Sequence, residues 1–277
     1  MSDIHFGAED PGLVEALAVR LDEVRPDVVV ASGDFTMAGR RREFQRAAAF
    51  VESLGVPVVA TPGNHDIPVQ NLAERFARPF ARYHRWMGPV TVGQYVDARC
   101  ALLALNSARA WDLSFNWSHG RLSDGQVAEA DRFFARAPGS RFRALVVHHP
   151  FYVPEELPGF RLIGNGEAML EVLARRGVHA VLSGHLHQRH MATREIAIEG
   201  ERRRVVVLQV ASPTTTRRRD QPNAFHVLEV GAAGVVMTEQ VAVDGVFAEG
   251  ERNEVVRFGG AQETGPCETA LGRAGGA

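Results

Sequence analysis

Histidines, carboxylates and an asparagine recur in five short clusters along the first two thirds of the sequence. The clusters read Asp-x-His, Gly-Asp, Gly-Asn-His-Asp, His-His-Pro and Gly-His-x-His. Carboxylate oxygens and neutral imidazoles, without a thiolate, suit Mn, Fe or Zn ions. Seven ligands are too many for one ion and a carboxylate can bridge two, so the clusters predict a site for two divalent or trivalent metal ions. The predicted ligands are Asp3, His5, Asp34, Asn64, His148, His185 and His187.

Two metal ions about 3.5–4 Å apart can hold a bridging hydroxide as nucleophile and can stabilise the attacking and leaving oxygens during in-line displacement at phosphorus. The predicted chemistry is therefore hydrolysis of a phosphate ester. Each cluster by itself is weak evidence, because Asn and Gly also favour turns and the histidines before Pro150 suit a polar strand end. The prediction depends on all five clusters occurring together, in this order.

Short β-branched runs precede four of the clusters and predict strands that are buried on both faces of a sheet. In open α/β sheets, ligands bind outside the carboxyl ends of the strands. Segments that are far apart in the sequence are therefore expected to converge on one place. The predicted strands span 28–32, 56–61, 144–147 and 180–183.

Amphipathic patterns between these strands predict helices, one of which opens at the N-cap Ser123 while another ends at Gly177. The predicted helices span 11–24, 40–54, 123–137 and 167–176. In the last third, alternating runs predict two hairpins, which pair 191–198 with 203–210 and 225–230 with 235–243. We expect one domain, with a disordered tail where Gly, Ala, Thr and Glu predominate; the boundaries are 1–258 for the domain and 259–277 for the tail.

Composition narrows the class of protein. The 277 residues carry a net charge of −2, which gives no sign of a nucleic-acid partner. No apolar run approaches the ~20 residues of a membrane helix and no signal peptide is visible, so we expect a cytoplasmic protein without membrane contact; a homo-oligomer is compatible with the sequence. All 31 basic residues are arginine, which excludes lysine-based chemistry such as Schiff bases and P-loops. With only Cys100 and Cys267, a disulfide framework is not expected.

The ordered set of clusters resembles the calcineurin-like metallophosphoesterase superfamily, and most of all its class III cyclic-nucleotide phosphodiesterases and glycerophosphodiesterases. The motifs span 3–187, and the resemblance implies an α/β fold, a four-layer α/β/β/α sandwich of two mixed sheets. It implies one ion at Asp3, His5 and His187 and a second at Asn64, His148 and His185, with Asp34 bridging them. It places His65 beside the leaving group as general acid or electrostatic stabiliser, with Asp66 orienting its imidazole. His149 matches no ligand of the family, which leaves a structural and a substrate-side role open.

The beginning of the chain departs from the family pattern. The family has an apolar strand before Asp-x-His, whereas this sequence begins Met1-Ser2-Asp3, so the first strand is expected to be truncated. Either the start site is wrongly assigned, or the chain is shortened, or the first metal site is weakened because two of its ligands lie on a frayed terminus. We favour a misassigned start, since the other ligands are present.

The substrate is expected to be a small phosphodiester or nucleotide. The loops beside the clusters offer neutral groups that suit the single charge of a diester, namely Asn106, Ser107, Asn116 and Ser118. Three aromatic residues could either stack on a nucleobase or belong to the core: Trp86, Trp111 and Phe115. Three consecutive arginines could either bind an anion or be a solvated run: Arg217, Arg218 and Arg219. The alternatives are a phosphomonoesterase or nucleotide-sugar pyrophosphatase on the same centre, and a non-catalytic scaffold of the same fold. His65 argues against the scaffold, which has no need of an acid beside the metals.

Overall fold

The computed structural model describes residues 1–111, 118–137, 142–216 and 221–258. A six-stranded sheet with the order β3-β4-β5-β6-β8-β7 forms its centre. β4, β5, β6 and β8 run parallel, and β3 and β7 are antiparallel edge strands. The strands span Gln94–Val96 (β3), Cys100–Ala104 (β4), Phe142–Val146 (β5), Ala180–Ser183 (β6), His190–Ile198 (β7) and Glu201–Gln209 (β8).

A second β layer packs on one face of this sheet and consists of two pieces. One is the parallel pair β1 (Val29–Ala31) and β2 (Val58–Ala60), and the other is an antiparallel sheet with the order β11-β10-β9. Side chains of both layers form one core, for example Leu102 with Val59 and Met237. The strands of the antiparallel piece span Ala224–Val230 (β9), Gly234–Val243 (β10) and Val246–Arg257 (β11).

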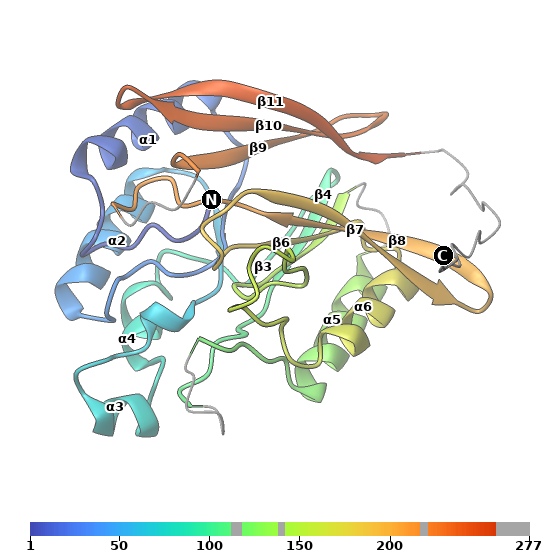
Figure 1. Ribbon diagram of the computed structural model, residues 1–277, viewed down its shortest axis with the longest axis horizontal. Helices are drawn as coiled ribbons and strands as arrows, with labels where there is room; N and C mark the ends of the chain where they lie inside the picture. The colour runs from blue at the N-terminus through green and yellow to red at the C-terminus, as the bar shows by residue number, and fades with distance from the viewer. Residues whose placement is uncertain (112–117, 138–141, 217–220, 259–277) are drawn as a thin grey trace, which may run out of the picture.

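Helices cover the two outer faces (Figure 1). α5 and α6 pack on the free face of the six-stranded sheet, where Phe134 and Leu173 meet Leu145. α1 and α2 cover the second β layer, where Leu17 and Phe44 belong to the same core. The predicted four-layer α/β/β/α sandwich is therefore confirmed. The helices span Pro11–Val24 (α1), Arg41–Ser53 (α2), Leu72–Ala77 (α3), Ala81–Trp86 (α4), Asp124–Arg136 (α5) and Gly166–Arg175 (α6).

Local signals set the ends of the longer helices. Asp10 caps α1 by accepting from the peptide nitrogens of Gly12 and Leu13, and Ser123 forms a capping box with Gln126 at α5. Gly177, just beyond α6, has the positive φ of 63° that favours glycine there. The four helices predicted from the sequence are found within one residue at each end. Among the described residues, no helix has the length and apolar content needed to span a membrane.

The first residues of the chain are held along the loop that follows β1. Peptide nitrogens of Asp3, His5 and Phe6 donate to carbonyls of residues 33–35 at 2.9–3.0 Å, and both Asp3 and His5 are fully buried. The alternative in which these two ligands lie on a frayed terminus therefore does not apply to this structure. A cavity of about 420 Å³ lies between β1 and β9, and Met1 is one of the residues that line it.

Candidate metal centre

The loops that carry the predicted ligands adopt backbone conformations that L residues rarely take. Such a residue costs on the order of 1–3 kcal/mol and persists only where its surroundings hold it. The strain is concentrated on residues that would bind metal, which is typical of a functional site. Five ligands have φ angles between 53° and 72°, namely Asp3, His5, Asp34, His185 and His187.

Two glycines make room for the carboxylates. A Cβ at Gly63 would overlap the side chain of Asp34, and a Cβ at Gly184 would overlap that of Asp3. The glycines of Gly-Asn-His-Asp and Gly-His-x-His are therefore required by close approach of another segment, and not only by their own turns.

A first group of metal-binding atoms comes from the chain start and the loop after β6. The Nε2 atoms of His5 and His187 are 3.1 Å apart, and Asp3 Oδ1 lies 3.3 Å from the His187 nitrogen and 3.7 Å from the His5 nitrogen. The two rings are stacked with centroids 4.9 Å apart. Asp3 Oδ1 is fully buried and has no hydrogen-bond partner among the described residues, so a cation at this point would satisfy an otherwise costly oxygen.

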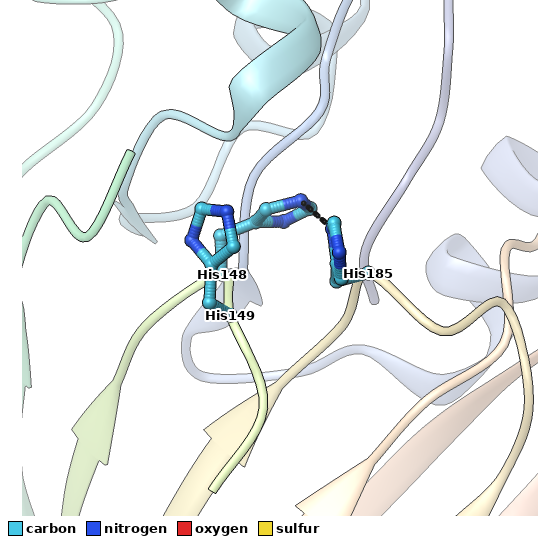
Figure 2. Close-up of side chains that lie close together, drawn as sticks. All are labelled: His148, His149 and His185. Carbon is cyan, nitrogen blue, oxygen red and sulfur yellow. Dashed lines mark hydrogen bonds between the residues drawn. The ribbon is translucent and has the colours of Figure 1, made fainter. Parts of the chain in front are cut away.

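A second group comes from the loops after β2, β5 and β6. His148 Nε2 is 3.1 Å from Asn64 Oδ1 and 3.2 Å from His185 Nδ1, the latter contact being the dashed line in Figure 2. Three potential ligand atoms from different segments thus point at one another. An ion placed between these three atoms could bind all of them, since imidazole nitrogen and amide oxygen are both suitable metal ligands.

Asp34 lies between the two groups. Its Oδ2 is 3.2 Å from His148 Nε2 in the second group and 3.8 Å from His5 Nε2 in the first. The structure therefore brings all seven predicted ligands close together, and Asp34 lies between the two groups.

Burial and charge prepare these side chains for metal ions. Burial lowers the pKa of His5 to about 4 and that of His185 to about 3, so both rings are neutral near pH 7 and have a free lone pair. Burial also acts against the charge of His148, but the Asp34 carboxylate outweighs it and raises the pKa to about 9. A metal ion would displace the proton that His148 keeps in its absence.

Main-chain carbonyls select the ring nitrogens that face the centre. His148 Nδ1 donates to the Ser32 carbonyl at 2.9 Å, and His5 Nδ1 lies 3.3 Å from the Thr36 carbonyl. Each contact places the proton on Nδ1 and leaves Nε2 as the ligand atom. These carbonyls were not predicted, because a backbone group leaves no signature in the sequence.

His65 lies next to the first group, with its ring edge-on to His5 at 4.9 Å between centroids. Asp66, which was expected to orient the His65 imidazole, hydrogen-bonds to the main chain around it. Its carboxylate accepts from the peptide nitrogens of Phe35, Thr36 and Gly63 and from the Thr36 hydroxyl at 2.9–3.2 Å. Asp66 therefore ties the loop after β1 to the loop after β2. The hydrogen-bond partner of His65 Nδ1 is the Met37 carbonyl, at 2.8 Å.

The residues expected along the substrate cleft have mixed outcomes. Ser107 is buried and its hydroxyl contacts His149 Nδ1 at 2.8 Å, so it does not line the cleft. Asn106 and Ser118 are partly exposed. Trp86 packs against the core, whereas Trp111 is 58% exposed. Phe115, Asn116, Arg217, Arg218, Arg219 and Cys267 lie outside the described residues.

A model of the calcineurin-like phosphoesterase family matches residues 1–189. The chain belongs to this family. As a calcineurin-like phosphoesterase it is a metal-dependent phosphoesterase, which is consistent with its curated relatives. A probable cyclic nucleotide phosphodiesterase from Synechococcus sp. is 32% identical over 73% of this chain and 70% of its own length. The glycerophosphodiester phosphodiesterase GpdQ from Enterobacter lignolyticus is 30% identical over 54% of this chain and 55% of its own length.

A third relative is the 3',5'-cyclic adenosine monophosphate phosphodiesterase CpdA from Escherichia coli, 27% identical over 63% of this chain and 61% of its own. Solved structures agree with the calcineurin-like phosphoesterase fold. A dimetal phosphatase from Danio rerio superposes with a TM-score of 0.61 over 93% of this chain and 97% of its own, at 15% identity. The purple acid phosphatase PPD1 from yellow lupin gives a TM-score of 0.67 over 98% of this chain and 56% of its own, at 13% identity.

Proposed function

We propose that this phosphoesterase hydrolyses small phosphodiesters at a centre of two metal ions, Mn, Fe or Zn. The observation that carries the proposal is the position of Asp34, whose Oδ2 is within 3.8 Å of a histidine nitrogen of each group. A carboxylate in that position is what a bridged pair of ions requires. One ion would be held by Asp3, His5 and His187, the other by Asn64, His148 and His185, and both by Asp34.

Bound at these groups, the ions would lower the pKa of a water molecule and neutralise charge on the phosphoryl oxygens. The remaining chemistry falls to His65. With Nδ1 donating to the Met37 carbonyl, His65 would act from Nε2 as an imidazolium, either donating the Nε2 proton to the departing oxygen or stabilising its charge. Because a diester leaves an alkoxide, proton donation at this point is worth more than for a leaving group that is stable as an anion.

The preference for diesters over monoesters rests on two supports. The curated relatives act, by their names, on cyclic nucleotides and glycerophosphodiesters. In addition, Asn106 and Ser118 are neutral, and a neutral wall suits the single charge of a diester better than the higher charge of a monoester.

The test is kcat/KM for bis(p-nitrophenyl) phosphate against p-nitrophenyl phosphate, measured with Mn, Fe and Zn in turn. This ratio compares transition-state stabilisation directly. We expect the diester to be favoured with each active metal. A ratio that favours the monoester would replace the diesterase assignment by a phosphatase, and activity restricted to nucleotide sugars would replace it by a pyrophosphatase.

A further inference from the structure

His149 is a fully buried imidazole that lies beside the second metal group without being one of its proposed ligands. Its ring centroid is 4.8 Å from that of His185 and 4.9 Å from that of His148, and Figure 2 shows the three rings gathered together. Phe160 meets the His185 ring edge-on at 5.6 Å. The His149 and Phe160 rings thus lie beside His185 in addition to His148, and the His149 ring lies beside both His148 and His185.

Two loops hold the His149 ring in place. Ser107 Oγ lies 2.8 Å from its Nδ1 and accepts from its peptide nitrogen at 3.3 Å. The backbone of Gly120 packs directly against the ring, so closely that a Cβ at this position would overlap the imidazole. The Arg121 peptide nitrogen donates to the Ser107 carbonyl at 2.9 Å, which joins the loop after β4 to the loop before α5. His149 is therefore clamped between two segments that carry none of the seven ligands.

We propose that His149 is a positioning residue, whose ring fixes the orientation of the His148 and His185 imidazoles and thereby sets the metal affinity of the second group. This inference rests on the proposed function, in which Asn64, His148 and His185 hold an ion. Side chains that orient ligands without binding the metal are typically worth about 10–100-fold in affinity. Without such a neighbour, the ligand ring could rotate, and ordering it on binding would lower the affinity for the ion.

An alternative role for His149 follows from its second nitrogen. Nε2 is buried, and potential ligand atoms of His148, His149 and His185 lie within 4.8 Å of one another. A direct ligand would use the nitrogen, whereas a positioning residue acts through the shape of the ring and its bond to Ser107. Replacing the ring by a phenyl group separates the two roles.

The experiment titrates Mn²⁺ into the metal-stripped full chain by calorimetry and follows the two equivalents separately. We expect His149→Ala to weaken one equivalent about 10–100-fold and to leave the other unchanged. Gly120→Ala, which displaces the ring without touching a ligand, should weaken the same equivalent. His149→Phe should keep most of the affinity, because the phenyl ring preserves the packing against His148 and His185.

Two results would overturn the proposal. One is parent affinity for both equivalents in His149→Ala. The other is a combined result: His149→Phe loses as much metal affinity as His149→Ala, while Ser107→Ala binds normally. That pattern would show that the His149 Nε2 is itself a metal ligand. His179→Phe is the matched control, since His179 is a partly buried histidine just before β6, at the end opposite His185. If the parent chain itself binds fewer than two ions, the proposed two-metal function fails, and this result is distinguishable from a failure of the role proposed for His149.

Discussion

The His65 imidazole donates from Nδ1 to the main-chain carbonyl of Met37 over 2.8 Å. Since a carbonyl only accepts, this contact keeps a proton on Nδ1 and leaves Nε2 as the nitrogen available for the proposed chemistry. The acceptor is part of the backbone, so the orientation of His65 is set by the loop after β1, which Asp66 in turn holds through Phe35 and Thr36.

Replacing His65 by alanine should lower turnover of alkyl diesters by about 10²–10⁴-fold, the usual contribution of a general acid. Metal content should stay at the parent value, because His65 is not among the seven ligands. The loss should shrink for p-nitrophenolate leaving groups, which need no proton. Single-turnover rates on both kinds of diester provide the measurement, and equal activity of parent and variant on the alkyl diester would remove His65 from the mechanism.

Asp66→Asn should act on stability more than on chemistry. The carboxylate accepts four hydrogen bonds at 2.9–3.2 Å, and an amide would turn its NH₂ toward N–H donors. Leaving buried donors without an acceptor should lower the free energy of unfolding by about 2–4 kcal/mol. Urea denaturation measures this loss. A stable Asp66→Asn protein with a large fall in kcat would instead restore a direct role for Asp66 beside His65.

Asp34→Asn should weaken both metal equivalents, because Asp34 Oδ2 reaches both groups. Asn64→Ala should weaken one equivalent and His187→Ala the other. Metal content after dialysis, together with the calorimetric titration, distinguishes these patterns. If Asp34→Asn behaved like a variant of one group only, Asp34 would not be a bridge.

Gly63→Ala should disrupt the centre, since its Cβ would overlap Asp34. We expect a lower unfolding free energy and loss of bound metal in the folded fraction. Gly93→Ala is the matched control, because a Cβ at Gly93 meets no atom within 4 Å, and it should be close to neutral. Normal metal binding by Gly63→Ala would show that the loop can shift without cost.

His179 should make the fold sensitive to acid. Burial, together with the Arg143 charge, lowers its pKa from 6.5 to about 4, and its Nδ1 accepts from the Arg143 peptide nitrogen at 3.1 Å. The folded state therefore holds this ring neutral, and its contribution is present above pH 6.5 and is lost as the pH falls toward 4. By linkage the loss is about 1–3 kcal/mol.

The measurement is the unfolding free energy at pH 7 and at pH 4.5 for the parent and for His179→Asn. Asparagine retains an acceptor but does not titrate in this range, so the variant should lose less stability between the two pH values. Identical slopes for the two proteins would assign the acid sensitivity to other groups.

Much of the fold could be predicted from the sequence because its signals are local. α1 and α5 have caps and apolar spacing that a single window contains, and β6 is a continuous apolar run. α3 and α4 were not predicted, since six residues are too few for a helical period to show. β11 was missed because most of its side chains are exposed and polar, which removes the alternation that marks a strand.

The sequence by itself determined the residue types of the centre: seven oxygen and nitrogen ligands without a thiolate, placed mostly at strand ends. Their chemistry and order predicted two metal positions, and strand ends of one sheet must meet. Only the tertiary structure decided what surrounds them. The Met37 carbonyl, the role of Asp66 between two loops and the Ser107–His149 contact depend on segments that are distant in sequence, and backbone groups are the same in every residue, so no pattern of side chains announces them.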